Sequence, residues 1–187
     1  MTNGVQTMAG VNGWRIAGWG FAAALIVTPA VAMQFTSEVK WTALDFVFAA
    51  VMIGGTGLLI ELAVRKSRNW AYRGGAGLAL AAAFLLVWIN AAVGIIGGED
   101  NPANLIFPAI VAIAAVGTLI ARGRPSGMAR TMFVIAAAQA LTGAAVFAFG
   151  TASTQPPGPV GLLMLIEGFA AMWLGSALLF RRAARAG

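Results

Sequence analysis

Three polar side chains stand inside long apolar runs of this sequence: Asn90, Gln139 and Glu167. If those runs lie in lipid, a carboxylate near mid-membrane costs about 2.5–3.5 kcal/mol, so it is normally protonated, paired or turned towards water. Glu167 is the leading candidate for chemistry. No lysine or arginine lies at its predicted depth, so a buried carboxyl there would stay neutral or accept a proton.

Long apolar runs position these side chains, and the composition indicates that lipid surrounds most of the chain. Of 187 residues, 60% are hydrophobic and only 10% charged, with a mean hydropathy of +0.86. A soluble domain carries about 25% charged residues. Six runs approach the roughly 20 residues needed to cross a bilayer. We therefore predict an all-α integral membrane bundle, a single transmembrane domain over 1–187, with helices at about 14–33, 42–64, 73–97, 102–121, 130–150 and 160–180.

The basic residues predict the orientation of this bundle. Of the 12 lysines and arginines, only Lys40 falls between runs on one side; the others collect at the opposite ends of the runs. By the positive-inside rule, both termini are cytoplasmic. This distribution also explains the net charge of +6 without a nucleic-acid partner. The first run resembles a signal peptide, but it is long enough to span, and we expect it to be retained.

Counting along the runs places the polar side chains relative to one another. Glu167 lies seven residues into the sixth run, about 10 Å below the outer boundary at 1.5 Å per residue. Asn90 lies at a similar depth in the third run, and Gln139 lies deeper in the fifth. If these helices pack together, the three form one polar cluster, with Trp88 nearby. The structural alternative is a set of hydrogen bonds between helices, worth about 0.6–2 kcal/mol each.

A second candidate site is the acidic turn Glu99, Asp100, Asn101 and Asn104, on the predicted outer side. As structure, Asn101 caps the fourth helix and Pro102 takes its first position, or Asn104 is the cap. As function, the turn binds a cation or a partner. The tripeptide Asn-Pro-Ala at 101–103 also occurs in aquaporins, but it is present once here, no arginine follows it, and a full span comes next. We therefore reject an aquaporin.

Three further patterns are interpreted as structural. Thr42 and Asp45 match a capping box at the start of the second helix. Glu61 and Arg65 match an i,i+4 pair at the cytoplasmic boundary. Glycines are dense, and small residues allow close helix contact in lipid. Those contacts serve either internal packing or an interface with a partner.

The chain has no cysteine and no histidine. Disulfides, cysteine nucleophiles, bis-histidine haem and most zinc sites are therefore excluded. We find no nucleophile or metal constellation, so we expect a protein that is not an enzyme and has neither cofactor nor metal.

The segments 87–90, 92–97 and 99–104 read VWIN, AVGIIG and EDNPAN. With them the chain resembles a family of small uncharacterised bacterial inner-membrane proteins, over about Trp41 to Arg130. The resemblance implies a bacterial inner-membrane, multi-pass protein. It implies no activity and no site residue, because the family has no assigned function.

Two functions fit these observations. The first is a non-enzymatic multi-span protein that acts by association with other membrane components, as an accessory, assembly or structural subunit or as a homo-oligomer. Short loops and abundant small residues favour it. The alternative is a small transporter or channel with a proton- or cation-linked polar site in the outer half of the membrane.

Overall fold

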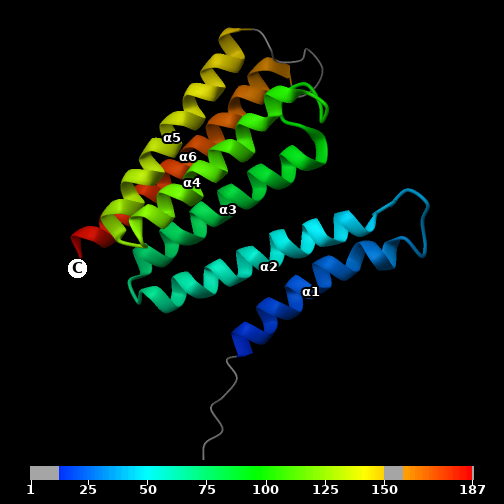
Figure 1. Cartoon of the computed structure of the whole chain (residues 1–187), viewed down its shortest axis with the longest axis horizontal. Coiled ribbons are helices and arrows are strands. Elements are labelled where there is room, and N and C mark those ends of the chain that lie inside the picture. Colours follow the sequence, from blue (N-terminus) through cyan, green and yellow to red (C-terminus); the bar gives the residue numbers. More distant parts are fainter. Residues whose placement is uncertain (1–12, 150–157, 187) are drawn as a thin grey trace, which may run out of the picture. The chain divides into compact units, whose positions relative to one another are not determined.

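A computed structural model describes residues 13–149 and 158–186, and all regular elements in those ranges are helical (Figure 1). Six helices are long and apolar enough to cross a membrane. The predicted all-α class with six spanning helices is therefore confirmed, and the chain is a multi-pass membrane protein. The elements are α1 (Gly13–Ala32), α2 (Ala43–Lys66), α3 (Trp70–Val93), the 3-10 turn η1 (Pro102–Leu105), α4 (Ile106–Ala121), α5 (Pro125–Ala148) and α6 (Gly158–Arg185).

The chain divides into two compact units, and the boundary between them in the sequence falls between Leu59 and Ile60, inside α2. The first unit holds α1 and most of α2. Its α2 begins with the predicted capping box: the Thr42 backbone N–H donates to Asp45 Oδ2 at 2.6 Å, and the Thr42 hydroxyl donates to the same oxygen at 2.8 Å. The backbone bond is one of the two bonds of a capping box.

The second unit is built from α3, α4, α5 and α6, which run alongside one another (Figure 1). Helix α6 packs against both α3 and α5, while α4 packs against α5 and α3. The largest fully buried side chains include Trp173, Phe107 and Phe180. Between α6 and α3, the Ser176 hydroxyl donates to the Gly75 carbonyl at 2.8 Å. Helix α6 therefore lies at the centre of the contacts that position the candidate residues.

At the end of α2, Glu61 accepts from Arg65 at 3.1 Å, so the predicted i,i+4 pair is confirmed. Helix α3 then starts at Trp70, three residues before the predicted start at 73. Asn69 explains the difference, because its side chain accepts from the N–H groups of Ala71 and Tyr72 at 2.9 and 3.3 Å. This cap replaces bonds that the first turn of a helix lacks.

Other helix ends also differ from the predicted ones, and α6 extends to Arg185 where the prediction ended at 180. Helix α3 ends at Val93 and not at 97, because Gly94 has a φ of +63° and a Cβ there would overlap the backbone of Gly98. Helix α5 begins at Pro125 and not at 130, with proline at the first helical position, where its missing N–H costs nothing. The hydropathy pattern missed this first turn because residues 125–129 include a proline, a serine and a glycine and are followed by Arg130.

Candidate functional site

Gln139 lies on the buried face of α5 with 0% of its surface exposed. Neither Nε2 nor Oε1 of its side chain has a hydrogen-bond partner. An amide can donate two hydrogen bonds and accept two. A fully buried amide with none is rare in native interiors and calls for an explanation such as a bound water or ligand.

Glu167 approaches α5 one turn from Gln139. Its Oε1 lies so close to Gly143 that a Cβ added to that glycine would overlap it, and the same Cβ would lie 3.1 Å from Ile166 Cγ2. Gly143 follows Gln139 by four residues and therefore lies on the same face of α5. Glu167 is partly buried. The structure thus brings two of the three predicted residues to one helix interface, separated by about 6 Å along the axis at 1.5 Å per residue.

Trp173 on α6 carries a buried polar group that the sequence analysis missed. It is 1% exposed, and its indole Nε1 has no hydrogen-bond partner. In the antiparallel register set by Gly143 and Glu167, Gln139 lies level with about residue 171, roughly 3 Å along the axis from Trp173. Trp173 shares one face of α6 with Ile166, Phe169, Ala170 and Ala177, which are all buried.

Asn90 is the third predicted residue, and it stands apart from the other two. Its Oδ1 is buried without a partner. Contacts of Gly74 with Leu179 and of Gly75 with Ser176 set an antiparallel register of α3 and α6. In that register Asn90 lies level with residues 161–163, about four to six residues, or roughly 6–9 Å, from the level of Glu167. Within the described ranges no hydrogen bond joins Asn90, Gln139 and Glu167.

Trp88, which was expected near this cluster, stacks on Phe84 of the same helix at a centroid distance of 5.5 Å.

The interior of the α3–α6 unit therefore holds unpaired buried donors and acceptors from three helices. The indole offers a donor, the glutamine amide offers both kinds, and Asn90 offers an acceptor. Such a set can bind water or a small molecule that carries both donors and acceptors. Comparison with family models, curated proteins and solved structures gave no match. The chemistry of this site is therefore argued from its own residues.

The acidic turn contains two residues with structural roles. Asn101 caps η1 by accepting from the Ala103 N–H at 3.0 Å. Asn104 is 5% exposed: its Oδ1 accepts from Ile96 N at 2.7 Å, and its Nδ2 donates to the carbonyls of Ile96 and Gly98 at 3.3 and 2.6 Å. The cap at Asn101 agrees with the first structural interpretation. Asn104 does not cap α4; it holds the loop that follows α3.

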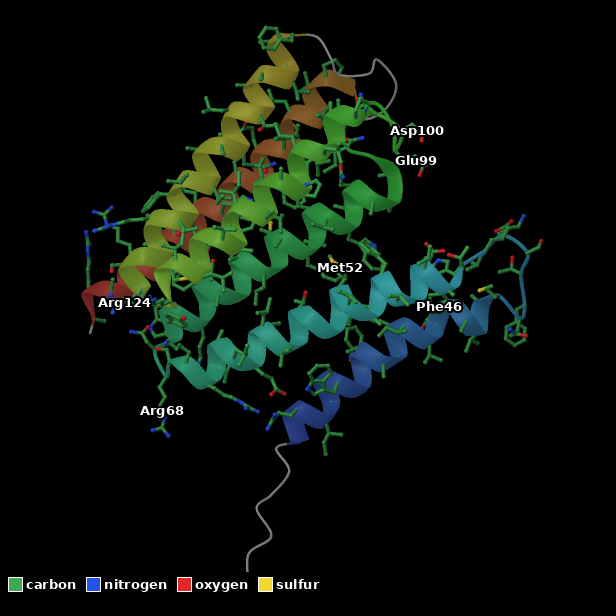
Figure 2. All side chains as sticks on the ribbon, in the orientation of Figure 1. Phe46, Met52, Arg68, Glu99, Asp100 and Arg124 are labelled. Carbon is green, nitrogen blue, oxygen red and sulfur yellow. The ribbon has the colours of Figure 1, made fainter. Side chains whose placement is uncertain are left out.

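The other two residues of the turn, Glu99 and Asp100, are exposed. Figure 2 shows them at one end of the four-helix unit, with Arg68 and Arg124 at the opposite end. In residues 13–149 and 158–186, no three acidic side chains gather closely enough to hold a metal ion. Asn104 is bonded to the loop backbone while Glu99 and Asp100 are exposed, and cation binding by the turn stays a prediction.

Proposed function

We propose that this chain is a non-enzymatic, multi-pass protein of the bacterial inner membrane that acts by association with another membrane component. The observation that supports this proposal is a pair of adjacent glycines on α2 that no side chain covers. Within the four-helix unit, most glycines inside the helices face a side chain of the neighbouring helix, while Gly77 and Gly168 are open. Gly75 faces Phe180, Gly117 faces Thr131, Gly127 faces Ala121, Gly143 faces Ile166, and Gly175 faces Leu78.

On α2, Gly54 and Gly55 have open space where a Cβ would stand. Gly57 on the same helix is covered by the ring of Trp19, 3.3 Å from the position of an added Cβ. Small residues let helices approach closely in lipid, where helix association depends on such packing. The open glycines of α2 therefore favour a helix from a partner or from a second copy.

The test is purification in mild detergent, with the mass of the particle measured. We expect a stoichiometric partner or an oligomer, which the double substitution Gly54→Leu and Gly55→Leu should release. Gly77→Leu with Gly168→Leu is the matched control, because it adds the same bulk at two open positions, on α3 and α6, and should leave the particle intact. A wild-type particle that is strictly monomeric and without a partner would contradict the proposal.

A second function is favoured by the unpaired groups in the four-helix unit. In this alternative the chain is a small transporter or channel, and Glu167 and Gln139 contact a proton, a cation or a small polar substrate. The observation in its favour is the fully buried Gln139 amide without a partner, one turn from the Glu167 contact with Gly143. A buried polar group within a membrane span is a functional-site hypothesis by default.

Flux in proteoliposomes tests this alternative. Glu167→Gln should abolish a proton- or cation-linked flux. The control is Glu61→Gln, which removes a carboxylate that pairs with Arg65 at the end of α2. Equal flux in the wild type and in the Glu167→Gln variant would contradict the role of Glu167 in transport.

A further inference from the structure

An open groove of about 530 Å³ runs between α4 and α5. Its walls are mainly the apolar side chains of Ile113, Ile120 and Val134. Its volume falls within the range of about 300–1,000 Å³ that is usual for small-molecule sites. The groove belongs entirely to the four-helix unit and is separate from the interior that holds Gln139.

The floor of the groove is a close approach of the two helices. A Cβ added at Gly117 would overlap Thr131, and one added at Gly127 would lie 2.8 Å from Ala121 Cβ. The Thr131 hydroxyl donates to the Gly127 carbonyl at 3.1 Å. Close packing of this kind leaves little room for rearrangement, so the groove is a fixed feature of the α4–α5 pair.

One end of the groove is cationic. Arg124, Ser126 and Arg130 line it. Neither guanidinium forms an ion pair or hydrogen bond within the described ranges. Figure 2 shows Arg124 at the end of the four-helix unit opposite Glu99 and Asp100. This end is the one predicted to face the cytoplasm.

The backbone adds to the positive potential of this end. Helix α5, 24 residues long, starts here, and its N-cap Arg124 makes no side-chain capping bond. The N–H groups of the first turn of a helix lack helical partners and favour an anion. Together with the two arginines they make the end of the groove suitable for a phosphate group.

We propose that this groove binds an anionic glycerophospholipid from the leaflet on the arginine-rich side. The phosphate lies against Arg124, Ser126 and Arg130, and an acyl chain lies along Ile113, Ile120 and Val134. Basic pockets between transmembrane helices on the cytoplasmic side suit such headgroups. A free phosphate would leave the apolar walls uncovered, and a zwitterionic lipid would bring its own ammonium group close to both guanidinium groups, which repel it.

The experiment is native mass spectrometry of the purified full chain, titrated with phosphatidylglycerol and with phosphatidylcholine of the same acyl chains. We expect a preference for phosphatidylglycerol that falls about 30-fold in the double variant Arg124→Gln and Arg130→Gln, equivalent to about 1 kcal/mol for each arginine. The matched control is Arg181→Gln with Arg185→Gln. These arginines lie near the end of α6, do not line the groove, and should leave the preference unchanged.

A second variant tests the apolar part of the groove. Val134→Trp adds bulk at a position that is 63% exposed, so it should block the acyl chain and leave the fold intact. Leu141→Trp is its control, since Leu141 is 70% exposed on the same helix but lies outside the groove. We expect at least a tenfold loss of phosphatidylglycerol binding in the first variant and none in the second.

Three outcomes would overturn the proposal. One is equal binding of the two lipids by the wild type. Another is an equal loss in the two double-arginine variants, because the effect would then be the general attraction of a basic surface. The third is competition by inorganic phosphate that matches competition by phosphatidylglycerol, because the site would then recognise the anion alone.

Discussion

We predict that Gln139→Leu increases the stability of the four-helix unit. The Gln139 side chain is completely buried, and neither of its polar atoms has a partner. An unpaired buried polar group costs about 1–3 kcal/mol, whereas an apolar side chain of similar size costs nothing of this kind. In the unfolded state within a bilayer or micelle the amide also finds partners, so removing it eliminates a penalty specific to the folded state.

The expected size of the effect is a gain of about 1–3 kcal/mol in the free energy of unfolding. Gln139→Ala separates this effect from packing. It removes the same amide but leaves a cavity, which costs about 2–5 kcal/mol for a large apolar residue in a core. The alanine variant should therefore be no more stable than the wild type.

The assay is equilibrium unfolding in mixed micelles with increasing SDS, followed by circular dichroism. The reasoning would be refuted if Gln139→Leu were less stable than the wild type by 1 kcal/mol or more. The amide would then have a partner that stabilises the fold, and its hydrogen bonds would be structural. A stabilised leucine variant without flux would instead support the transporter alternative.

The same unfolding assay checks three further variants. Gly117→Ala should cost about 1–3 kcal/mol, because the added Cβ overlaps Thr131 and lies 2.9 Å from its Oγ1; the gain in helix propensity of about 1 kcal/mol is smaller, and Thr131→Ala in the same chain should recover most of the loss. Asn104→Ala should cost about 1–3 kcal/mol and accelerate hydrogen exchange at the Ile96 amide, which loses its acceptor at 2.7 Å; unchanged exchange would contradict this. Gly94→Ala should cost about 1–2 kcal/mol or more, since alanine rarely adopts a φ of +63° and its Cβ overlaps Gly98; a neutral effect would show that the loop adopts another conformation.

Hydropathy was sufficient to predict the six spanning helices, because only a helix satisfies its own backbone groups along an apolar run. The ends of the helices depend on local chemistry that a hydropathy window does not register. Asn69 starts α3 by capping it, and Gly94 ends α3 through a positive φ. Pro125 starts α5 in a segment that contains Arg130. The sequence contained these signals, but they carry little weight in an average over 20 residues.

The sequence was sufficient to assign Gln139 and Glu167 to spanning helices, but not to show which way their side chains turn. Counting residues placed Gln139 and Glu167 within the membrane, and the structure puts both on the α5–α6 interface. Trp173 was missed because lipid-facing and core-facing positions are equally apolar in such helices. On α6, Met164 and Leu174 are exposed while Leu162 and Ile166 are buried. With lipid on one side and a core on the other, hydrophobicity does not mark the buried face.

Asn104 and Gln139 show how the same kind of side chain can have opposite consequences. Both are buried amides in the four-helix unit, but Asn104 uses its oxygen and its nitrogen to hold the backbone at Ile96 and Gly98. The Gln139 amide forms no hydrogen bond with any residue in the described ranges. A buried polar side chain that bonds to no other group lowers the stability of the fold. Such residues are expected at binding sites, because departures from good packing concentrate at functional sites. Substitution of Asn104 should therefore lower the free energy of unfolding. Removal of the Gln139 amide should raise it, and any activity that depends on the amide should be lost.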